Sequence, residues 1–321
     1  MRPEDREAPE TVADLGEFNL IRRVTSGRTQ PAATLLGPGD DAAVVVASDG
    51  RVVASTDVLV EGVHFRLDWS TPEQVGRKAV AVNLADVAAM GATPSGLLIG
   101  LACPSSTPTA MIDELTTGLW HEAARARVGL VGGDVVRCDT LVISITALGD
   151  LQGREPVTRA GAMPGDVVAV AGRLGWAAAG LAVLGRGFRS PVSVVSAHRS
   201  PEPPYPAGPQ AAEAGATSMI DVSDGLLADL GHVAESSGVG IDVQTKLLEV
   251  HQRLIDVSSA LGADPRNWVL TGGEDHALAA TFPGPDAVPQ GWRTIGTVRR
   301  GKGVTVDGET YEGRSGWEHW R

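Results

Sequence analysis

A segment rich in glycine, proline and charged residues divides the chain into two halves that share one pattern of elements. It covers residues 149–165, and on either side of it apolar, β-branched runs of strand length alternate with longer segments of helical character. Such alternation is typical of folds in which helices cover a sheet. A chain of 321 residues is long enough to bury two cores. We therefore expect an α/β (α+β) fold with an N-terminal domain over residues 15–150, a C-terminal α/β domain over 151–321 and a disordered leader over 1–14.

The clearest single element is a helix in the N-terminal half that begins after Thr71. Thr71 supplies an N-cap, Pro72 occupies the first helical position, and Gln74 completes a capping box. Gly91 supplies the stop signal. Further strands are expected at residues 96–103 and 141–148, with another helix at 108–129. This half therefore combines a sheet with helices.

Two apolar runs, residues 42–48 and 51–60, flank the dipeptide Asp49-Gly50. An Asp-Gly pair between β-branched runs favours a tight turn between paired strands. The sequence therefore predicts a hairpin here. Because both runs are largely apolar, we expect it to belong to a sheet covered on both faces.

The C-terminal half repeats the alternation of strands and helices. Strands are expected at 166–172 and 218–222, helices at 174–185 and 225–237, the second ending at Gly238, and a proline-rich connection at 200–209. A second α/β domain of similar size follows from this pattern.

The acidic surplus of the chain argues against nucleic acid as a partner. It has 27 Lys plus Arg against 39 Asp plus Glu, a formal net charge of −12, whereas neutralising phosphates requires a basic face.

No apolar run approaches the roughly 20 residues of a membrane span, and the N-terminal residues lack a signal peptide. We therefore expect a cytoplasmic protein that does not bind membranes. Cys103 and Cys138 form no CxxC pattern and are expected to be buried thiols.

One motif has the spacing of a phosphate-binding P-loop and is rejected on its context. Residues 296–302 read GxxxxGK, but Gly303 stands where a Ser or Thr would bind magnesium. The flanking residues predict a hairpin with no helix following. The chain also lacks GxGxxG, GxSxG and HExxH, so neither dinucleotide binding, serine hydrolysis nor zinc hydrolysis is supported.

Acidic residues next to glycine or a hydroxyl residue recur at the ends of apolar elements. They lie in the motifs GDD (39–41), STD (55–57), GGD (132–134), DVSDG (221–225) and GGED (272–275). Carboxylate oxygens are the ligands that Mg²⁺ prefers in proteins. Each motif alone is more simply a turn, or a helix cap in which Ser223 or Asp224 opens the following helix. Their recurrence in one chain favours a metal site.

Asp86 has an unusual place on the expected helix that follows Thr71. Helical spacing puts it on one face with Val75, Ala79 and Val82, in the middle of an apolar stripe. A buried charge must be paired or bound to a metal. A buried pair with Arg77 or Arg137 is the simpler alternative, and the other acidic motifs favour metal.

The ordered set of motifs resembles the thiamine-monophosphate kinases from residue 15 onward. The motifs are GEFNLI (16–21), GDDAAV (39–44), STD (55–57), GVHF (62–65), KAVAVNLADVAAMGATP (78–94), GGD (132–134), TRAGAMPGD (158–166), DVSDGL (221–226), GGED (272–275) and GWEHW (316–320). The resemblance implies an aminoimidazole ribonucleotide synthetase-like fold of two domains. In this fold the N-terminal sheet forms a barrel across a homodimer. It also implies transfer of a phosphoryl group from ATP to thiamine monophosphate with several Mg²⁺ ions.

The same resemblance assigns roles to individual residues. It implies metal ligands at Asp41, Ser55, Thr56, Asp57, Asp86, Asp134, Asp221 and Asp224, ATP contacts at Gly133, Asp134, Arg159 and Ser223, and substrate contacts at His64, Glu274 and Trp317. Phosphoryl transfer needs alignment and charge neutralisation rather than covalent chemistry from the protein. A substrate phosphate is already ionised near neutral pH, so no general base is expected.

Two alternatives remain open. One is another ATP-dependent member of the same superfamily. Selenophosphate synthetase is disfavoured because no reactive Cys or Lys lies near the N-terminus, and the hydrogenase maturation protein HypE because the GWEHWR segment has no cysteine. Aminoimidazole ribonucleotide synthetase lacks the GVHF and GWEHW elements. The other alternative is a non-catalytic protein that binds divalent metal through the same acids.

Overall fold

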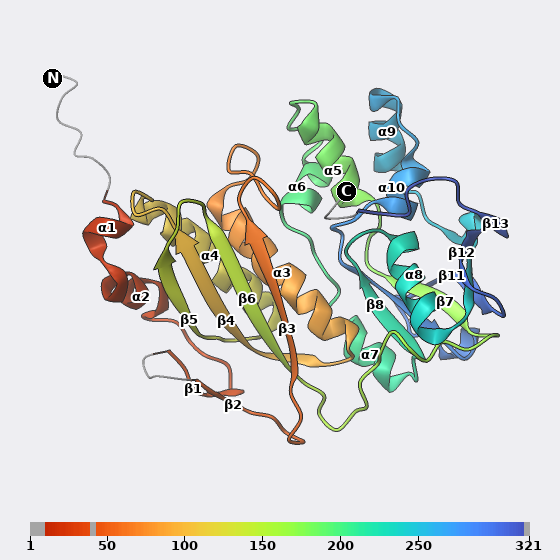
Figure 1. Cartoon of the computed structure of the whole chain (residues 1–321), viewed down its shortest axis with the longest axis horizontal. Coiled ribbons are helices and arrows are strands. Elements are labelled where there is room, and N and C mark those ends of the chain that lie inside the picture. Colours follow the sequence, from red (N-terminus) through yellow and green to blue (C-terminus); the bar gives the residue numbers. More distant parts are fainter. Residues whose placement is uncertain (1–9, 39–42, 318–321) are drawn as a thin grey trace. The chain divides into compact units, whose positions relative to one another are not determined.

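The computed structural model describes residues 10–38 and 43–317 (Figure 1). Their contacts group them into two compact units. The described residues of the first unit fall within Met1–Val46, Thr56–Val80 and Ser95–Ala147, and those of the second within Ala47–Ser55, Ala81–Pro94 and Leu148–Arg321. Two short segments that the sequence places in the N-terminal half, 47–55 and 81–94, thus group with the C-terminal half.

The expected disordered leader is wrong for residues 10–14. Helix α1 (Val12–Leu15) begins there, and Thr11 and Asp14 form a reciprocal capping box at its N-terminus. The N–H of Val12 donates to the carbonyl of Thr107 at 2.9 Å, which ties this segment to the first unit. A short charged stretch can therefore be ordered by its own cap and by main-chain pairing.

A four-stranded sheet has the order β3-β6-β4-β5. Its strands are β3 (Val53–Val60), β6 (Val142–Asp150), β4 (Thr93–Cys103) and β5 (Leu130–Arg137), and the helices α3 (Pro72–Ala89) and α4 (Thr109–Ala126) also belong to this part of the chain (Figure 1). The capping box of α3 is present, since the N–H of Thr71 donates to Gln74 and the N–H of Gln74 donates to Thr71. The predicted strands at 96–103 and 141–148 and both helices are confirmed, whereas β5 was not predicted.

The expectation of a sheet covered on both faces is wrong for β3. Alternate residues of this strand are exposed, and Val58 has 47% of its surface accessible. On the neighbouring strands Leu98 and Val136 are also exposed. Alternation of buried and exposed side chains is typical of a sheet with one face packed on a core. The sheet of a single chain therefore has an apolar face directed to solvent.

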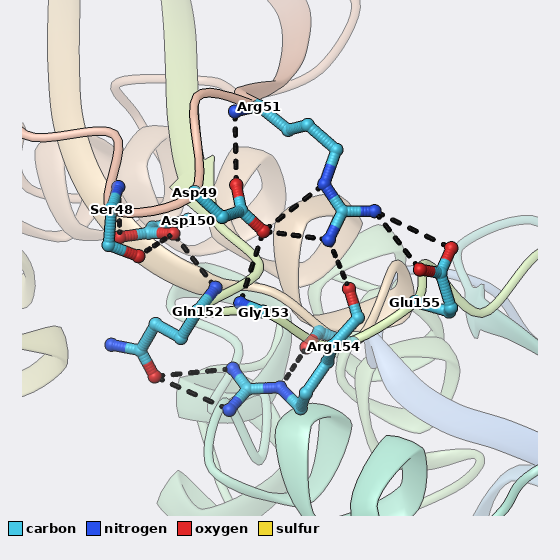
Figure 2. A network of polar contacts seen from close by, with 9 residues as sticks. Ser48, Asp49, Arg51, Asp150, Gln152, Gly153, Arg154 and Glu155 are labelled. Carbon is cyan, nitrogen blue, oxygen red and sulfur yellow. Dashed lines mark hydrogen bonds and ion pairs between the residues drawn. The ribbon is translucent and has the colours of Figure 1, made fainter.

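The predicted hairpin around Asp49-Gly50 is also wrong. The strand β2 (Val44–Val45) pairs instead with β1 (Thr34–Leu36), and β3 joins β6. The turn itself forms, but its polar groups bond to the loop 150–155 (Figure 2). Turn chemistry alone did not determine which strands pair.

Figure 2 shows how Asp49 holds this turn to that loop. One carboxylate oxygen accepts from the N–H of Gly153 at 3.1 Å and from the guanidinium of Arg51 at 2.7 Å. The Arg51 guanidinium also donates to the carbonyl of Arg154 at 2.8 Å. These bonds from Arg51 lower the pKa of the Asp49 carboxyl to about 2. The network fixes the start of the segment that leads into the second half of the chain.

A seven-stranded sheet has the order β13-β12-β9-β11-β7-β10-β8. Its strands are β13 (Glu309–Thr310), β12 (Gly303–Val306), β9 (Gly240–Val243), β11 (Arg293–Arg299), β7 (Val167–Ala171), β10 (Ala277–Phe282) and β8 (Ser218–Val222). The predicted strands at 166–172 and 218–222 are confirmed. The hairpin predicted around residues 296–303 is wrong, because β9 lies between β11 and β12 and is parallel to β12. A strand, and not a helix, follows Lys302.

Both faces of the sheet are buried at the end formed by β7, β10 and β8. Val168 of β7 and Ile220 of β8 pack with α8 (Leu226–Ser237) in one apolar core. Ala169 and Met219, which are adjacent to these residues on the same strands, lie in a second core with α7 (Ala207–Glu213) and the end of α3. The remaining helices of the C-terminal half are α5 (Trp176–Gly185), α6 (Val192–Arg199), α7 (Ala207–Glu213), α8 (Leu226–Ser237), α9 (Gln252–Leu261) and α10 (Pro265–Thr271), and α2 (Glu17–Thr25) lies near the N-terminus. The helices predicted at 174–185 and 225–237 are confirmed, and α7 begins inside the expected proline-rich connection.

Candidate functional site

Three segments that are distant in the sequence meet beyond the end of β8. The N–H of Glu274 donates to the carbonyl of Ser223 at 2.8 Å, and the N–H of Trp317 donates to the carbonyl of Asp224 at 3.0 Å. Four residues with predicted ATP, metal or substrate roles are therefore brought together by direct main-chain bonds. Trp317 is largely exposed, with 63% of its surface accessible.

Gly225 makes this close approach possible. Its φ is +136°, and a Cβ added there would lie 2.6 Å from the carbonyl oxygen of Thr271. Only glycine adopts this conformation without strain and leaves room for that carbonyl. The glycine of the DVSDG motif is therefore required by the turn.

The N-terminus of α8 is capped from inside the helix. Gly225 occupies the N-cap, and the Asp229 carboxylate accepts from the N–H groups of Asp224 at 3.1 Å and Gly225 at 3.0 Å. The alternative in which Ser223 or Asp224 opens this helix is therefore wrong. Asp229 is buried, and burial raises the pKa of its carboxyl to about 7. The charges of Asp221 and Asp224 act in the same direction.

Asp221 lies in β8 beside a buried histidine. Nδ1 of His276 is 3.0 Å from Oδ2 of Asp221, and both residues are 5% exposed. His276 precedes β10, and its N–H donates to the carbonyl of Val222 at 3.0 Å. The main chain thus places the imidazole directly against a predicted metal ligand.

Ser55 and Asp86, two predicted metal ligands in the second unit, are in contact. The hydroxyl of Ser55 donates to Oδ2 of Asp86 at 2.6 Å. The expected apolar stripe on α3 is wrong, since residues 78–89 are buried on every side except at Asp86, which is half-buried. Arg77, one of the partners considered for Asp86, pairs with Glu122 instead. Asp86 is thus the accessible acid of an otherwise buried stretch.

Thr56 and Asp57 follow Ser55 on β3 and point to alternate faces. Asp57 shares the face of Ser55, whereas Thr56 is exposed on the other face and its hydroxyl donates to the carbonyl of Ile145 at 3.0 Å. A hydroxyl that donates one hydrogen bond keeps lone pairs that can bind a cation.

Gly133 and Asp134 lie inside β5, where the sequence suggested the end of an element. They pair with Ile99 and Gly100 of the parallel strand β4. Asp134 is exposed, and its carboxylate accepts from the N–H of Val135 at 2.9 Å. In the sheet order, β6 and β4 separate β5 from β3, which is about 14 Å at the usual strand spacing. This sheet therefore does not bring Asp134 next to Asp57.

His64 lies in the turn after β3. Its Nδ1 accepts from the N–H of Val60 at 3.0 Å, and its carbonyl accepts from the buried Lys78 ammonium at 2.9 Å. An acceptor role for Nδ1 assigns the proton of the neutral ring to Nε2.

Arg159 lies apart from Ser223, although both were assigned to ATP. The carbonyl of Arg159 accepts from the hydroxyl of Ser237 at 3.0 Å, at the C-terminal end of α8. Ser223 precedes the N-terminus of the same helix, which has 12 residues and a length of about 18 Å. The main chain at Arg159 therefore lies near the end of α8 that is opposite Ser223.

The predicted metal ligands fit Mg²⁺ in kind, since they supply carboxylate and hydroxyl oxygens. Asp41 lies outside the described residues. Within residues 10–38 and 43–317, no group of at least three His, Cys, Asp or Glu side chains forms a ready metal cluster.

In the same ranges no helix has the length and apolar character to cross a membrane. Cys103 and Cys138 are free, the first buried and the second half-buried.

Comparison with known proteins identifies the family. Residues 39–151 match the AIR synthase related protein, N-terminal domain. Thiamine-monophosphate kinase of Mycobacterium tuberculosis is 54% identical over 310 residues, covering 96% of this chain and 92% of the relative. The chain belongs to the thiamine-monophosphate kinase family. The Escherichia coli thiamine-monophosphate kinase is 36% identical over 278 residues, which cover 84% of this chain and 83% of that protein.

Solved structures agree with this assignment to the thiamine-monophosphate kinase family. AaThiL complexed with AMPPCP and TMP has a TM-score of 0.80 and 31% identity, covering 98% of this chain and all of that chain. The hydrogenase maturation protein HypE in complex with ATP has a TM-score of 0.69 at 21% identity, covering 89% and 88%. The second likeness shows a shared fold alone. The sequence-based resemblance is thus confirmed.

Two residues at the site of this thiamine-monophosphate kinase family member were missed by sequence reasoning. Asp229 and His276 both contact predicted ligands, yet neither belongs to the motifs singled out as ligands. A weak signal existed for each. Asp229 falls in the first turn of a helix that follows DVSDG, and His276 directly follows GGED.

Proposed function

We propose that this chain catalyses the phosphorylation of thiamine monophosphate by ATP, with thiamine diphosphate and ADP as products. The observation that carries this proposal is the meeting of Ser223, Asp224, Glu274 and Trp317 through main-chain hydrogen bonds. These residues come from motifs whose predicted roles are to bind ATP, metal and substrate. A relative with the same fold, AaThiL, has been solved with AMPPCP and TMP.

Carboxylates and hydroxyls would hold several Mg²⁺ ions. The proposed ligands are Asp41, Ser55, Thr56, Asp57, Asp86, Asp134, Asp221 and Asp224. The contact between Ser55 and Asp86 supports one such group. Bound Mg²⁺ would neutralise charge on the phosphate oxygens.

ATP would be held by Gly133, Asp134, Arg159 and Ser223. Because Arg159 and Ser223 lie at opposite ends of α8, they would contact different parts of the nucleotide. His64, Glu274 and Trp317 would hold thiamine monophosphate. Trp317 would stack on a ring of the substrate, since its indole is largely exposed.

Transfer would be a direct in-line displacement. An oxygen of the substrate phosphate forms a bond to the γ-phosphorus as the bond to the bridging oxygen of ADP breaks. The attacking oxygen is already ionised near neutral pH. The protein therefore has to align and desolvate the two phosphates, and no side chain has to remove a proton.

A homodimer would complete the N-terminal sheet as a barrel. The exposed apolar residues Val58, Leu98 and Val136 support a covered face in the assembly. We place the enzyme in the cytoplasm, where ATP is available as co-substrate.

The deciding experiment measures product formation. The purified protein is incubated with ATP, Mg²⁺ and thiamine monophosphate, and thiamine diphosphate is separated by chromatography and quantified. Asp224→Asn should lower turnover strongly, whereas Asp286→Asn, an exposed acid in the same half, should leave it unchanged. Divalent-metal binding with no product would favour a non-catalytic metal-binding protein. ATP consumption with an aminoimidazole precursor would favour a sibling enzyme.

A further inference from the structure

We propose that His276 is a positioning residue that fixes the carboxylate of Asp221 so that its Oδ1 faces a bound divalent cation. This inference rests on the proposed function, because Asp221 is a metal ligand only in that proposal. His276 itself would touch neither the cation nor the substrates.

The main chain around His276 restricts where its imidazole can lie. His276 has a φ of +51°, and its N–H is bonded to the carbonyl of Val222. The next residue, Ala277, begins the ladder of β10 with β8. His276 is thus held on both sides of its Cα by pairing with the strand that carries Asp221. Left-handed backbone in a non-glycine residue is uncommon and is often found at functional sites.

The bond between the two side chains has a defined direction. An ionised carboxylate can only accept hydrogen bonds, so Nδ1 of His276 is the donor to Oδ2 of Asp221 at 3.0 Å. Among the described residues, no other side chain or main-chain group donates to this carboxylate. One oxygen is therefore fixed by the ring and the other is left for a ligand.

The surrounding charge explains why orientation matters. Asp221 and Asp224 act together on the buried Asp229, so negative charge is concentrated within this part of the chain. A cation would relieve that repulsion only if the Asp221 oxygen were directed towards it. Groups that orient metal-ligating carboxylates raise metal affinity, and their removal costs about 10- to 100-fold in affinity or activity.

The test compares two amides of different length. His276→Asn keeps an N–H at the position of Nδ1 and tolerates left-handed backbone, whereas His276→Gln moves the amide to the position of Nε2. Binding of Mn²⁺ to each full-length variant is measured by electron paramagnetic resonance with a non-hydrolysable ATP analogue. Thermal unfolding of each variant shows whether it remains folded.

We expect His276→Gln to weaken Mn²⁺ binding by about tenfold or more, and His276→Asn to retain most of it. The KM for thiamine monophosphate should change little in either variant. Equal Mn²⁺ affinity in the wild type and His276→Gln, with both folded, would overturn the proposal, as would equal losses in both variants. If the wild type forms no thiamine diphosphate, the proposed function fails, while the Mn²⁺ titration still decides the role of His276.

Discussion

The Asp229 carboxylate accepts a hydrogen bond from the main-chain N–H of Gly225 at 3.0 Å, so a residue inside α8 caps its own helix. The same oxygen accepts from Asp224, which fixes the loop that carries Ser223. Helix stability and the geometry of the candidate site are therefore linked through one carboxylate.

We expect Asp229→Ala to destabilise the protein and lower turnover together. Loss of a helix cap costs about 1 kcal/mol, and the unsatisfied N–H groups of Asp224 and Gly225 add to this cost. Denaturant unfolding and the rate of thiamine diphosphate formation are the two measurements. Glu235→Ala, an exposed acid on the same helix, is the control and should change neither. An Asp229→Ala enzyme with wild-type stability would show that the cap is unimportant.

The stability of the protein should depend on pH through Asp275. This carboxyl is buried and accepts from the N–H of Ala177 at 2.8 Å, and burial raises its pKa to about 7. An unfolded aspartate ionises near pH 4. Between about pH 4 and 7 the unfolded chain therefore binds fewer protons than the folded one, and stability falls as pH rises through this range.

Asp275→Asn removes that titration. Relative to the wild type, the variant should gain stability progressively from pH 5 to pH 7.5, by up to a few kcal/mol. Thermal unfolding across this range measures the difference, with Asp286→Asn as an exposed control. A difference between wild type and Asp275→Asn that stays constant with pH would contradict the prediction.

Gly133→Ala should disrupt the pairing of β4 with β5. A Cβ at this position would lie 2.0 Å from the carbonyl oxygen of Ile99, and φ is +157°. A main-chain atom cannot move away cheaply, so a loss of more than about 2 kcal/mol in unfolding free energy is expected. At Gly132 the nearest atom is the end of the Leu98 side chain at 3.1 Å. Gly132→Ala should therefore be milder, and similar losses in both variants would argue against this explanation.

Asp86→Asn should abolish most turnover and leave the fold intact. Ser55 donates to this carboxylate, and an asparagine retains an acceptor oxygen for that bond while losing the charge for Mg²⁺. We expect a loss of about a hundredfold or more in kcat, with little change in thermal unfolding. Full activity in the variant would mean that Asp86 has a structural role only.

The apolar face of the four-stranded sheet should control assembly. Val136→Glu places a charge on that face, and we expect the mass measured by sedimentation to fall from dimer to monomer. Leu181→Glu on α5 is the control, because Leu181 is 46% exposed and Val136 50%. A wild type that sediments as a monomer would contradict the dimer, and an unchanged mass for Val136→Glu would place the interface elsewhere.

Local signals in the sequence predicted most elements but not their partners. The helix after Thr71 follows from its own capping box, whose bonds lie within four residues. The hairpin around Asp49-Gly50 fails because Asp49 bonds to Gly153, a residue far along the chain. In the same way, β11 pairs with β9, which is distant in the sequence, and not with β12, which follows it directly.

In the candidate site, too, the sequence predicted residues within motifs but not the contacts between distant segments. Motifs and resemblance together pointed to Ser223, Glu274 and Trp317, and the main-chain bonds bring them together. His276 was missed because its role depends on a neighbour across two strands, which spacing along the chain does not reveal. The separation of Arg159 from Ser223 likewise follows from the length of α8, a property of the folded chain.

The hydrogen bond from Trp317 to Asp224 has a consequence for biosynthesis. The ribosome makes the DVSDG loop and the GGED turn well before it reaches residues 315–317. A chain that ended just before Trp317 would contain every strand of the seven-stranded sheet but would lack the indole that we propose contacts the substrate. Premature termination at that point would therefore remove the bond to Asp224 and leave the sheet complete.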